Sequence, residues 1–146
     1  MLLDAVQFCQ QVIDEVQPQV SQPLSFSYPA EPIKALWDRR LGRSLLTNLL
    51  LNAANYSPSN SPIQVSLSSD GEVATLTVQD VGRGIPVADL VSIREAFQRG
   101  SNVGDRPGSG LGLAIVHTAV TLHRGTWHID SAEGAGTTVT VHLLLE

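Results

Sequence analysis

The chain contains a single cysteine, Cys9, among its 146 residues. One cysteine cannot form an internal disulfide, and a cysteine-cluster zinc site needs several thiolates. The four histidines also lack the His-x-x-x-His spacing that places two metal ligands on one helix face. The sequence therefore excludes a disulfide scaffold, a cysteine-type zinc site and a zinc-protease helix.

Lysine is equally scarce, because Lys34 is the only one. A P-loop ends in a lysine that holds the β- and γ-phosphates, and no glycine-rich loop precedes Lys34. The Gly-x-Gly-x-x-Gly fingerprint of dinucleotide-binding folds is absent too. A nucleotide site in this chain would therefore need another design.

Long apolar runs and basic clusters are also missing. No stretch approaches the roughly eighteen consecutive apolar residues of a membrane-spanning helix, and the first four residues lack the basic start of a secretory signal. A net charge of −5 without a basic run argues against nucleic-acid binding. We therefore expect a cytoplasmic domain without direct membrane contact, which leaves a membrane anchor elsewhere in the full-length protein open.

The length favours one domain over residues 1–146, and the 42% hydrophobic content suffices for a core. Apolar residues at alternating steps of four and three predict an amphipathic helix over 2–16, along a stripe of Leu2, Val6, Cys9, Ile13 and Val16. Further helices are predicted from an N-cap at Asp38 to before Pro58, and from about Leu111 to Leu122.

Alternating apolar residues predict strands over 24–28, 63–67, 74–78, 126–131 and 137–145. Asp70-Gly71 joins the second and third of these as a hairpin. Neighbouring strands can pair without crossover helices. The predicted fold is a two-layer α/β sandwich of the α+β type, in which about three helices cover one face of a mixed, mainly antiparallel sheet.

Three segments carry candidate chemistry, and each has a purely structural alternative. Asn48 and Asn52 lie four residues apart on one helix face, where an amide oxygen can ligate Mg²⁺; helix-packing amides are the alternative. Asp80 follows a strand that we expect to end at Gln79. Its carboxylate can accept a hydrogen bond from an exocyclic amine such as adenine N6, and Gly82 and Gly84 would let a flat ring approach.

The alternative for Asp80 is an ordinary Asx-turn. The third segment opens the last predicted helix with glycines at alternate positions, Gly108, Gly110 and Gly112 around Leu111. Free N–H groups at a helix N-terminus favour a phosphate, whereas a flexible helix entry is the structural alternative.

Together these segments resemble the ATP-binding catalytic domain of sensor histidine kinases, in the Bergerat-fold group with gyrase, the Hsp90 chaperones and MutL. Residues 48–58 are similar to the family's asparagine box and 80–86 to its first glycine box. Residues 93–99 are similar to its phenylalanine box, 108–113 to its second glycine box, and 134–138 to its closing threonine motif.

The resemblance implies ATP and Mg²⁺ as cofactors, with Asn52 as the Mg²⁺ ligand and Asp80 as the partner of adenine N6. It implies a ring floor at Gly82 and Gly84, with Tyr56 flanking the nucleotide and residues 98–109 as an ATP lid. The remaining implied contacts are those of Arg99, Gly108, Gly110, Leu111 and Gly112 with phosphates, and of Thr137 or Thr138 with the base.

Two positions refine this interpretation. In the gyrase and Hsp90 relatives a glutamate stands where this chain has Asn48, and an amide cannot act as a general base near neutral pH. Asn48 therefore favours phosphoryl transfer over hydrolysis, and Asn48 and Asn52 are the candidate catalytic residues. Asn55 stands where these kinases carry a basic residue. Losing one charge-assisted contact costs about 1.5–3 kcal/mol, for which Arg99 or Arg106 can compensate.

The family's phosphoacceptor is a histidine on a separate dimeric hairpin, and His117, His123, His128 and His142 lack its motif. We therefore expect a kinase catalytic domain that does not phosphorylate itself, with that hairpin and a downstream response regulator as partners. Two alternatives remain at this point. One is an anti-sigma-type serine kinase of the same fold, and the other is a degenerate nucleotide-binding regulatory module.

Overall fold

A five-stranded sheet forms one layer of the computed structural model, which describes residues 2–82, 109–131 and 134–146. The parallel pair β2–β4 forms one side of the sheet, and every other neighbouring pair is antiparallel. In spatial order the strands are β2 (Leu24–Ser27), β4 (Ile63–Ser69), β5 (Val73–Asp80), β7 (Thr137–Leu144) and β6 (Thr126–Ser131).

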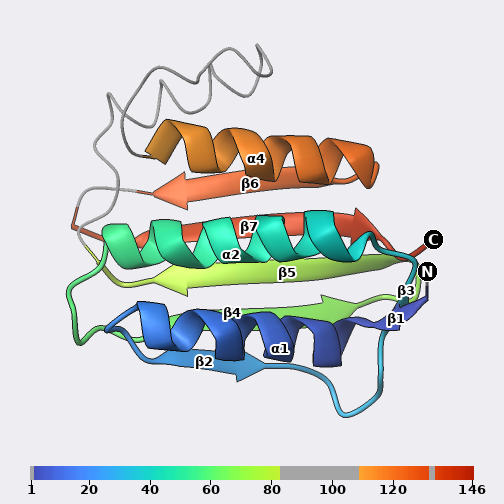
Figure 1. Ribbon diagram of the computed structural model, residues 1–146, viewed down its shortest axis with the longest axis horizontal. Helices are drawn as coiled ribbons and strands as arrows, with labels where there is room; N and C mark the ends of the chain where they lie inside the picture. Colours follow the sequence, from blue (N-terminus) through green and yellow to red (C-terminus); the bar gives the residue numbers. More distant parts are fainter. Residues whose placement is uncertain (1, 83–108, 132–133) are drawn as a thin grey trace.

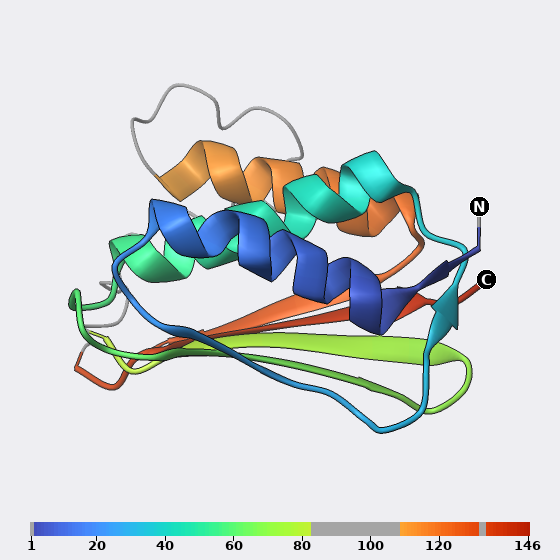
Figure 2. The same cartoon turned by 60° about the horizontal axis from the view of Figure 1, so that its bottom comes forward.

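The helices of the described residues form the second layer, on one face of this sheet (Figures 1 and 2). They are α1 (Ala5–Val16), α2 (Arg39–Asn55) and α4 (Ser109–Leu122). The predicted two-layer sandwich with a mixed, mainly antiparallel sheet is therefore confirmed. The predicted strands and the Asp70-Gly71 hairpin are present, although β5 continues through Asp80 instead of ending at Gln79.

The start of α1 differs from the prediction. Leu3–Asp4 forms a short strand, β1, that pairs antiparallel with β3 (Lys34–Ala35), so the chain is extended before the helix begins. The Asp4 carboxylate then caps α1 by accepting a hydrogen bond from the Val6 amide at 3.0 Å. Leu2 lies outside the helix and is 57% exposed.

The apolar stripe of α1 is also wider than predicted. Val6 is only partly buried, whereas the buried face comprises Ala5, Phe8, Cys9, Val12, Ile13 and Val16. Two neighbours explain the width, because α1 lies over the sheet and contacts α2 at the same time. A helix in that position buries a broad stripe rather than a single seam.

The other two helices begin close to the predicted residues. Asp38 caps α2 as predicted, since its Oδ1 accepts from the Leu41 amide at 2.9 Å. Helix α4 begins at Ser109, two residues before the predicted start. His123 joins the two helices: its Nε2 accepts from the Asp38 amide at 3.0 Å, while its Nδ1 lies 2.7 Å from the Ala119 carbonyl oxygen.

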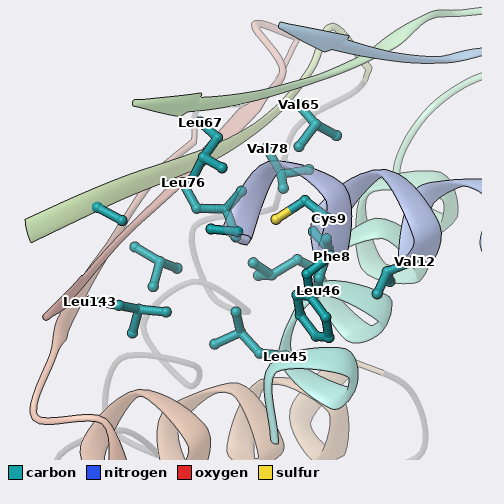
Figure 3. Packing of buried hydrophobic residues seen from close by; sticks show 14 of the residues in the cluster. Phe8, Cys9, Val12, Leu45, Leu46, Val65, Leu67, Leu76, Val78 and Leu143 are labelled. Atoms are coloured by element: carbon teal, nitrogen blue, oxygen red, sulfur yellow. The ribbon is translucent and has the colours of Figure 1, made fainter. Parts of the chain in front are cut away.

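The core lies between the helices and the covered face of the sheet (Figure 3). Alternate residues of β4, β5 and β7 point into it, and the residues between them are partly buried or exposed. This alternation places Asp80, the last residue of β5, on the covered face together with Leu76 and Val78. A carboxylate therefore stands where the periodicity calls for an apolar side chain.

Candidate functional site

A pocket opens where α2 and β5 end and β7 begins, and these ends of the three elements lie at the left of Figure 1. Four of the predicted site residues line it, alongside four apolar side chains. The lining comprises Asn52, Tyr56, Asp80 and Thr137 together with Leu49, Ala53, Val78 and Val139.

Asp80 is the charged group of this pocket and is only 3% exposed. Burial raises the pKa of its carboxyl, because the charged form loses hydration. The hydrogen bond from the Gly82 amide is the largest contribution that lowers this pKa in part. The Gly82 amide donates to Asp80 Oδ1 at 2.9 Å, which is the hydrogen bond of an Asx-turn. The carboxylate that forms this turn is therefore the same one that lines the pocket.

Two glycines allow the backbone to close tightly around Asp80. A Cβ atom on Gly82 would lie 2.2 Å from the Tyr56 carbonyl oxygen, and a Cβ on Gly136 would lie 2.3 Å from that of Asp80. Gly136 also has a φ of +81°, which side chains rarely adopt. The end of β5 therefore sits between the last turn of α2 and the start of β7, with no room for a side chain at either glycine.

The two asparagines of α2 are placed differently. Asn52 lines the pocket. The Asn48 amide, one turn earlier, donates to the Ser44 carbonyl oxygen at 2.6 Å and is absent from the pocket lining. The pair therefore shares a helix face, but only Asn52 can present its amide to a ligand in this pocket.

The two threonines also separate. Thr137 is buried opposite Asp80 and lines the pocket, and its hydroxyl lies 2.8 Å from that of Ser131. Thr138 pairs with Gln79 and, one residue along the strand, belongs to the other face of the sheet. Of the two predicted base contacts, the structure brings only Thr137 into the pocket.

Several predicted residues fall elsewhere. Gly84, Arg99, Gly108 and most of the expected lid over 98–109 lie outside the described residues. Gly110, Leu111 and Gly112 belong to the first turns of α4, which begins at Ser109. Their predicted contacts with phosphates stay predictions.

Sequence reasoning missed the apolar walls of the pocket, although their signal was available. Leu49 belongs to the predicted apolar face of α2, and Val78 and Val139 to the predicted alternation of β5 and β7. They form the part of the core that the pocket opens onto, and they give the pocket apolar walls.

Comparison with known proteins identifies the family. Residues 38–146 match the model of the histidine kinase-, DNA gyrase B- and HSP90-like ATPases. The chain belongs to this family. The match begins at the cap of α2 and includes every pocket-lining residue, which confirms the resemblance to the ATP-binding catalytic domain of histidine kinases.

Relatives of this ATPase domain are sensor histidine kinases. Sensor histidine kinase YvrG of Bacillus subtilis is 35% identical over 119 residues, which cover 81% of this chain and 20% of YvrG. WalK of the same organism is 31% identical over 147 residues, covering 97% of this chain and 24% of WalK. The chain thus spans about a fifth to a quarter of these relatives.

A solved structure shares the fold of the ATPase domain over nearly its full length. The mycobacterial sensor histidine kinase MprB superposes with a TM-score of 0.79 at 27% identity, covering 99% of this chain and 96% of that one.

No helix among the described residues of this chain is both long and apolar enough to cross a bilayer.

The side chains at the pocket suit one kind of metal site and not another. In the described part of the chain, no group of three or more histidine, cysteine, aspartate or glutamate side chains is arranged to hold a metal ion. Mg²⁺ commonly takes only one or two protein oxygens and completes its shell with water and substrate phosphates. A single amide oxygen from Asn52 at the pocket fits that kind of site.

Proposed function

We propose that this domain binds ATP with Mg²⁺ and donates the γ-phosphoryl group to a histidine on a separate dimerisation hairpin. The observation that carries the proposal is the buried Asp80 carboxylate in a pocket with apolar walls. Burying this carboxylate destabilises the ligand-free fold. A ligand that donates a hydrogen bond to the carboxylate offsets part of that free-energy cost, which is typical of a binding site.

The side chains that line the pocket suit adenine in their chemistry. The Asp80 carboxylate accepts a hydrogen bond from the exocyclic N6 amine, which guanine lacks at the equivalent position. Leu49, Val78 and Val139 offer apolar contacts to the ring. The absence of side chains at Gly82 and Gly136 keeps the backbone close to Asp80, so that its carboxylate is fixed before the base enters.

Asn52 lies in the same pocket and would hold the metal through its amide oxygen. Bound Mg²⁺ supplies charge neutralisation to the phosphates during transfer. The chain itself binds and orients the nucleotide: it fixes the base at Asp80, while the family's glycine-box amides face the phosphates. Catalysis by the domain is therefore mainly placement.

In the transfer step, an imidazole nitrogen of the acceptor histidine attacks the γ-phosphorus. The new N–P bond forms as the bond from phosphorus to the β–γ bridging oxygen breaks, and ADP leaves with that electron pair. Asn48 offers no base to activate a competing water, because it is a neutral amide whose N–H₂ already donates to Ser44. The phosphoryl group is therefore retained for the acceptor.

The acceptor belongs to a partner domain of the same kinase, and a response regulator receives the phosphoryl group downstream. Three histidines of this chain already have structural contacts. His123 joins α2 to α4, His128 pairs with Asp130 at 3.0 Å, and His142 Nδ1 lies 3.1 Å from Thr75 Oγ1. These contacts support an external acceptor.

The test combines binding with transfer. Calorimetric titration with Mg²⁺ and a non-hydrolysable ATP analogue should give a dissociation constant in the micromolar to low-millimolar range. Incubation with γ-labelled ATP and a purified histidine hairpin should then label the hairpin with an acid-labile, alkali-stable phosphate. An acid-stable product on a serine would instead support the serine-kinase alternative.

Two controls sharpen this experiment. Asn52→Ala should abolish the Mg²⁺ dependence of binding, whereas Asn48→Ala should leave analogue affinity close to wild type. A folded wild-type domain that binds no analogue would contradict the proposal and favour a degenerate regulatory module.

A further inference from the structure

Gln22 is a buried polar residue that lies before α2, outside the residues that match the family. Its side chain is only 4% exposed. Its Nε2 atom donates to two carbonyl oxygens, that of Ala54 at 2.9 Å and that of Ser57 at 3.0 Å. Glutamine is mostly exposed in proteins, so a buried one with two bonds to a single turn has a specific structural task.

The turn that Gln22 contacts is the carboxyl-terminal end of α2. The last four carbonyls of any helix lack an intrahelical donor. Here the C-cap residue is Tyr56, with φ −103° and ψ 4°, rather than a glycine in the left-handed conformation. The Ser57 amide reaches Ala54 at a long 3.4 Å. Gln22 supplies further donation to this turn from outside the helix.

The same turn forms one wall of the pocket. Tyr56, the C-cap residue of this turn, lines the pocket. Gly82, whose amide holds Asp80 Oδ1, approaches the Tyr56 carbonyl so closely that a Cβ would lie 2.2 Å from it. A shift of the turn would therefore reach Tyr56, Ser57 and the Gly82–Asp80 contact together.

Gln22 is itself held firmly. Gln17, in the short 3₁₀ helix η1 (Gln17–Gln19), donates from its Nε2 to the Gln22 carbonyl oxygen at 2.9 Å. Its Oε1 accepts from the Leu24 amide at 2.9 Å, so one side-chain amide pairs with residues 22 and 24 as a neighbouring strand would. The Ile63 amide donates to the Pro23 carbonyl oxygen from the other side.

We propose that Gln22 is a positioning residue of the nucleotide pocket, which fixes the end of α2 against Gly82 so that the Gly82 amide holds the Asp80 carboxylate in its binding geometry. The inference rests on the proposed nucleotide-binding function. It extends that site to a segment that the family match does not include. Gln22 acts through the turn and does not touch the nucleotide.

The test compares Gln22→Met with Trp37→Phe. Gln22→Met keeps an unbranched side chain of similar length and removes the donor. Trp37→Phe removes another side-chain donor to a backbone carbonyl, the 3.0 Å bond from Nε1 to Leu144. Trp37 precedes the other end of α2, a helix of 17 residues and therefore about 25 Å long. Both variants are compared at a temperature at which circular dichroism shows them folded.

Two readouts are measured. The first is the dissociation constant for Mg²⁺ with the non-hydrolysable ATP analogue. The second is hydrogen exchange at the Gly82 and Tyr56 amides without nucleotide. We expect Gln22→Met to weaken binding by about fivefold or more and to speed exchange at both amides, whereas Trp37→Phe changes neither. If Gln22→Met fails to fold, Gln22→Asn replaces it, because its amide is one methylene too short to reach both carbonyls.

Binding by Gln22→Met as tight as by Trp37→Phe overturns the proposal, even if exchange is faster. A wild-type domain that binds no analogue refutes the proposed function instead. In that case hydrogen exchange still decides the role of Gln22. Unchanged exchange rates at the Gly82 and Tyr56 amides overturn that role, and faster exchange confined to the Gln22 variant supports it.

Discussion

Replacing Asp80 by asparagine should weaken nucleotide binding and stabilise the nucleotide-free domain. Asparagine keeps the shape of the side chain and an oxygen that can accept from the Gly82 amide, whose bond to Asp80 is 2.9 Å long. It carries no charge whose burial is penalised. Substitutions that relieve such a functional strain commonly stabilise by about 0.5–2 kcal/mol, which corresponds to a rise in Tm of roughly 2–6 °C for a domain of this size.

The pH dependence of this stabilisation follows from the pKa of Asp80. Burial raises the folded-state pKa above the ordinary 3.8, so the folded state holds the proton more tightly than the unfolded state. Wild-type stability therefore falls as the pH rises from the unfolded pKa through the folded pKa. The advantage of Asp80→Asn should be full above the folded pKa and should disappear below about pH 3.8.

Binding should change in the opposite direction. The variant loses a charge-assisted hydrogen bond to the adenine amine, worth about 1.5–3 kcal/mol, which is roughly a ten- to hundredfold loss of affinity. Asp130→Asn is the matched control, because its side chain is 70% exposed on β6. It should leave both analogue affinity and the low-pH behaviour of Tm close to wild type.

Calorimetry with the ATP analogue measures the change in affinity. Thermal unfolding, repeated in steps of about one pH unit between about pH 3.5 and 8, measures the change in stability. Wild-type affinity in Asp80→Asn would refute the role assigned to the carboxylate. A Tm difference that stays constant across the whole pH range would refute the argument from burial.

Three further predictions concern other parts of the fold. Gly82→Ala should destabilise the domain by about 1–3 kcal/mol in urea unfolding, because its Cβ would collide with the Tyr56 carbonyl oxygen. Gly71→Ala is the control, since its Cβ meets no atom within 4 Å and it carries only the strain of its φ of +97°. Equal losses of stability in the two variants would contradict this reasoning. Cys9 is buried and its pKa is raised to about 12, so a thiol reagent at pH 8 should modify it only as fast as the domain unfolds. Rapid labelling without denaturant would count against the packing of α1. The pKa of Asp70 is lowered by hydrogen bonds from the two backbone amides that follow Gly71, so Asp70→Asn should lower Tm at pH 7, and this penalty should shrink as the pH falls below 3.8.

Most of the fold could be predicted from the sequence, because its signals are local. The Asp38 cap and the Asp70-Gly71 turn act within a few residues, and the alternation in β4, β5 and β7 directly reports the covered face. The start of α1 could not be predicted in this way. It depends on β1 pairing with β3, which lies about thirty residues later in the chain, and two-residue strands leave no periodic pattern.

The residues of the site also divide into those that the sequence could predict and those that depend on distant contacts. Motif spacing predicted Asn52, Tyr56, Asp80 and Thr137, and the structure brings these four together. The sequence could not show that the Asn48 amide is bonded to the Ser44 carbonyl oxygen, because that bond depends on a side-chain rotamer. Gln22 left no local signal either, since its partners lie 32 and 35 residues away.

The residues that contradict local rules are concentrated at one end of the sheet. A carboxylate replaces an apolar side chain at the last inward position of β5, Gly82 leaves no room for a Cβ, and Gly136 adopts a positive φ. Each feature is unfavourable or restrictive by itself, and all three surround the same carboxylate. A fold selected for stability alone would place valine at residue 80 and would have no need for the close approach of either glycine. Their convergence on Asp80 is therefore an argument for ligand binding that is independent of the motif match, and it makes the opposite effects of Asp80→Asn on stability and affinity the decisive comparison.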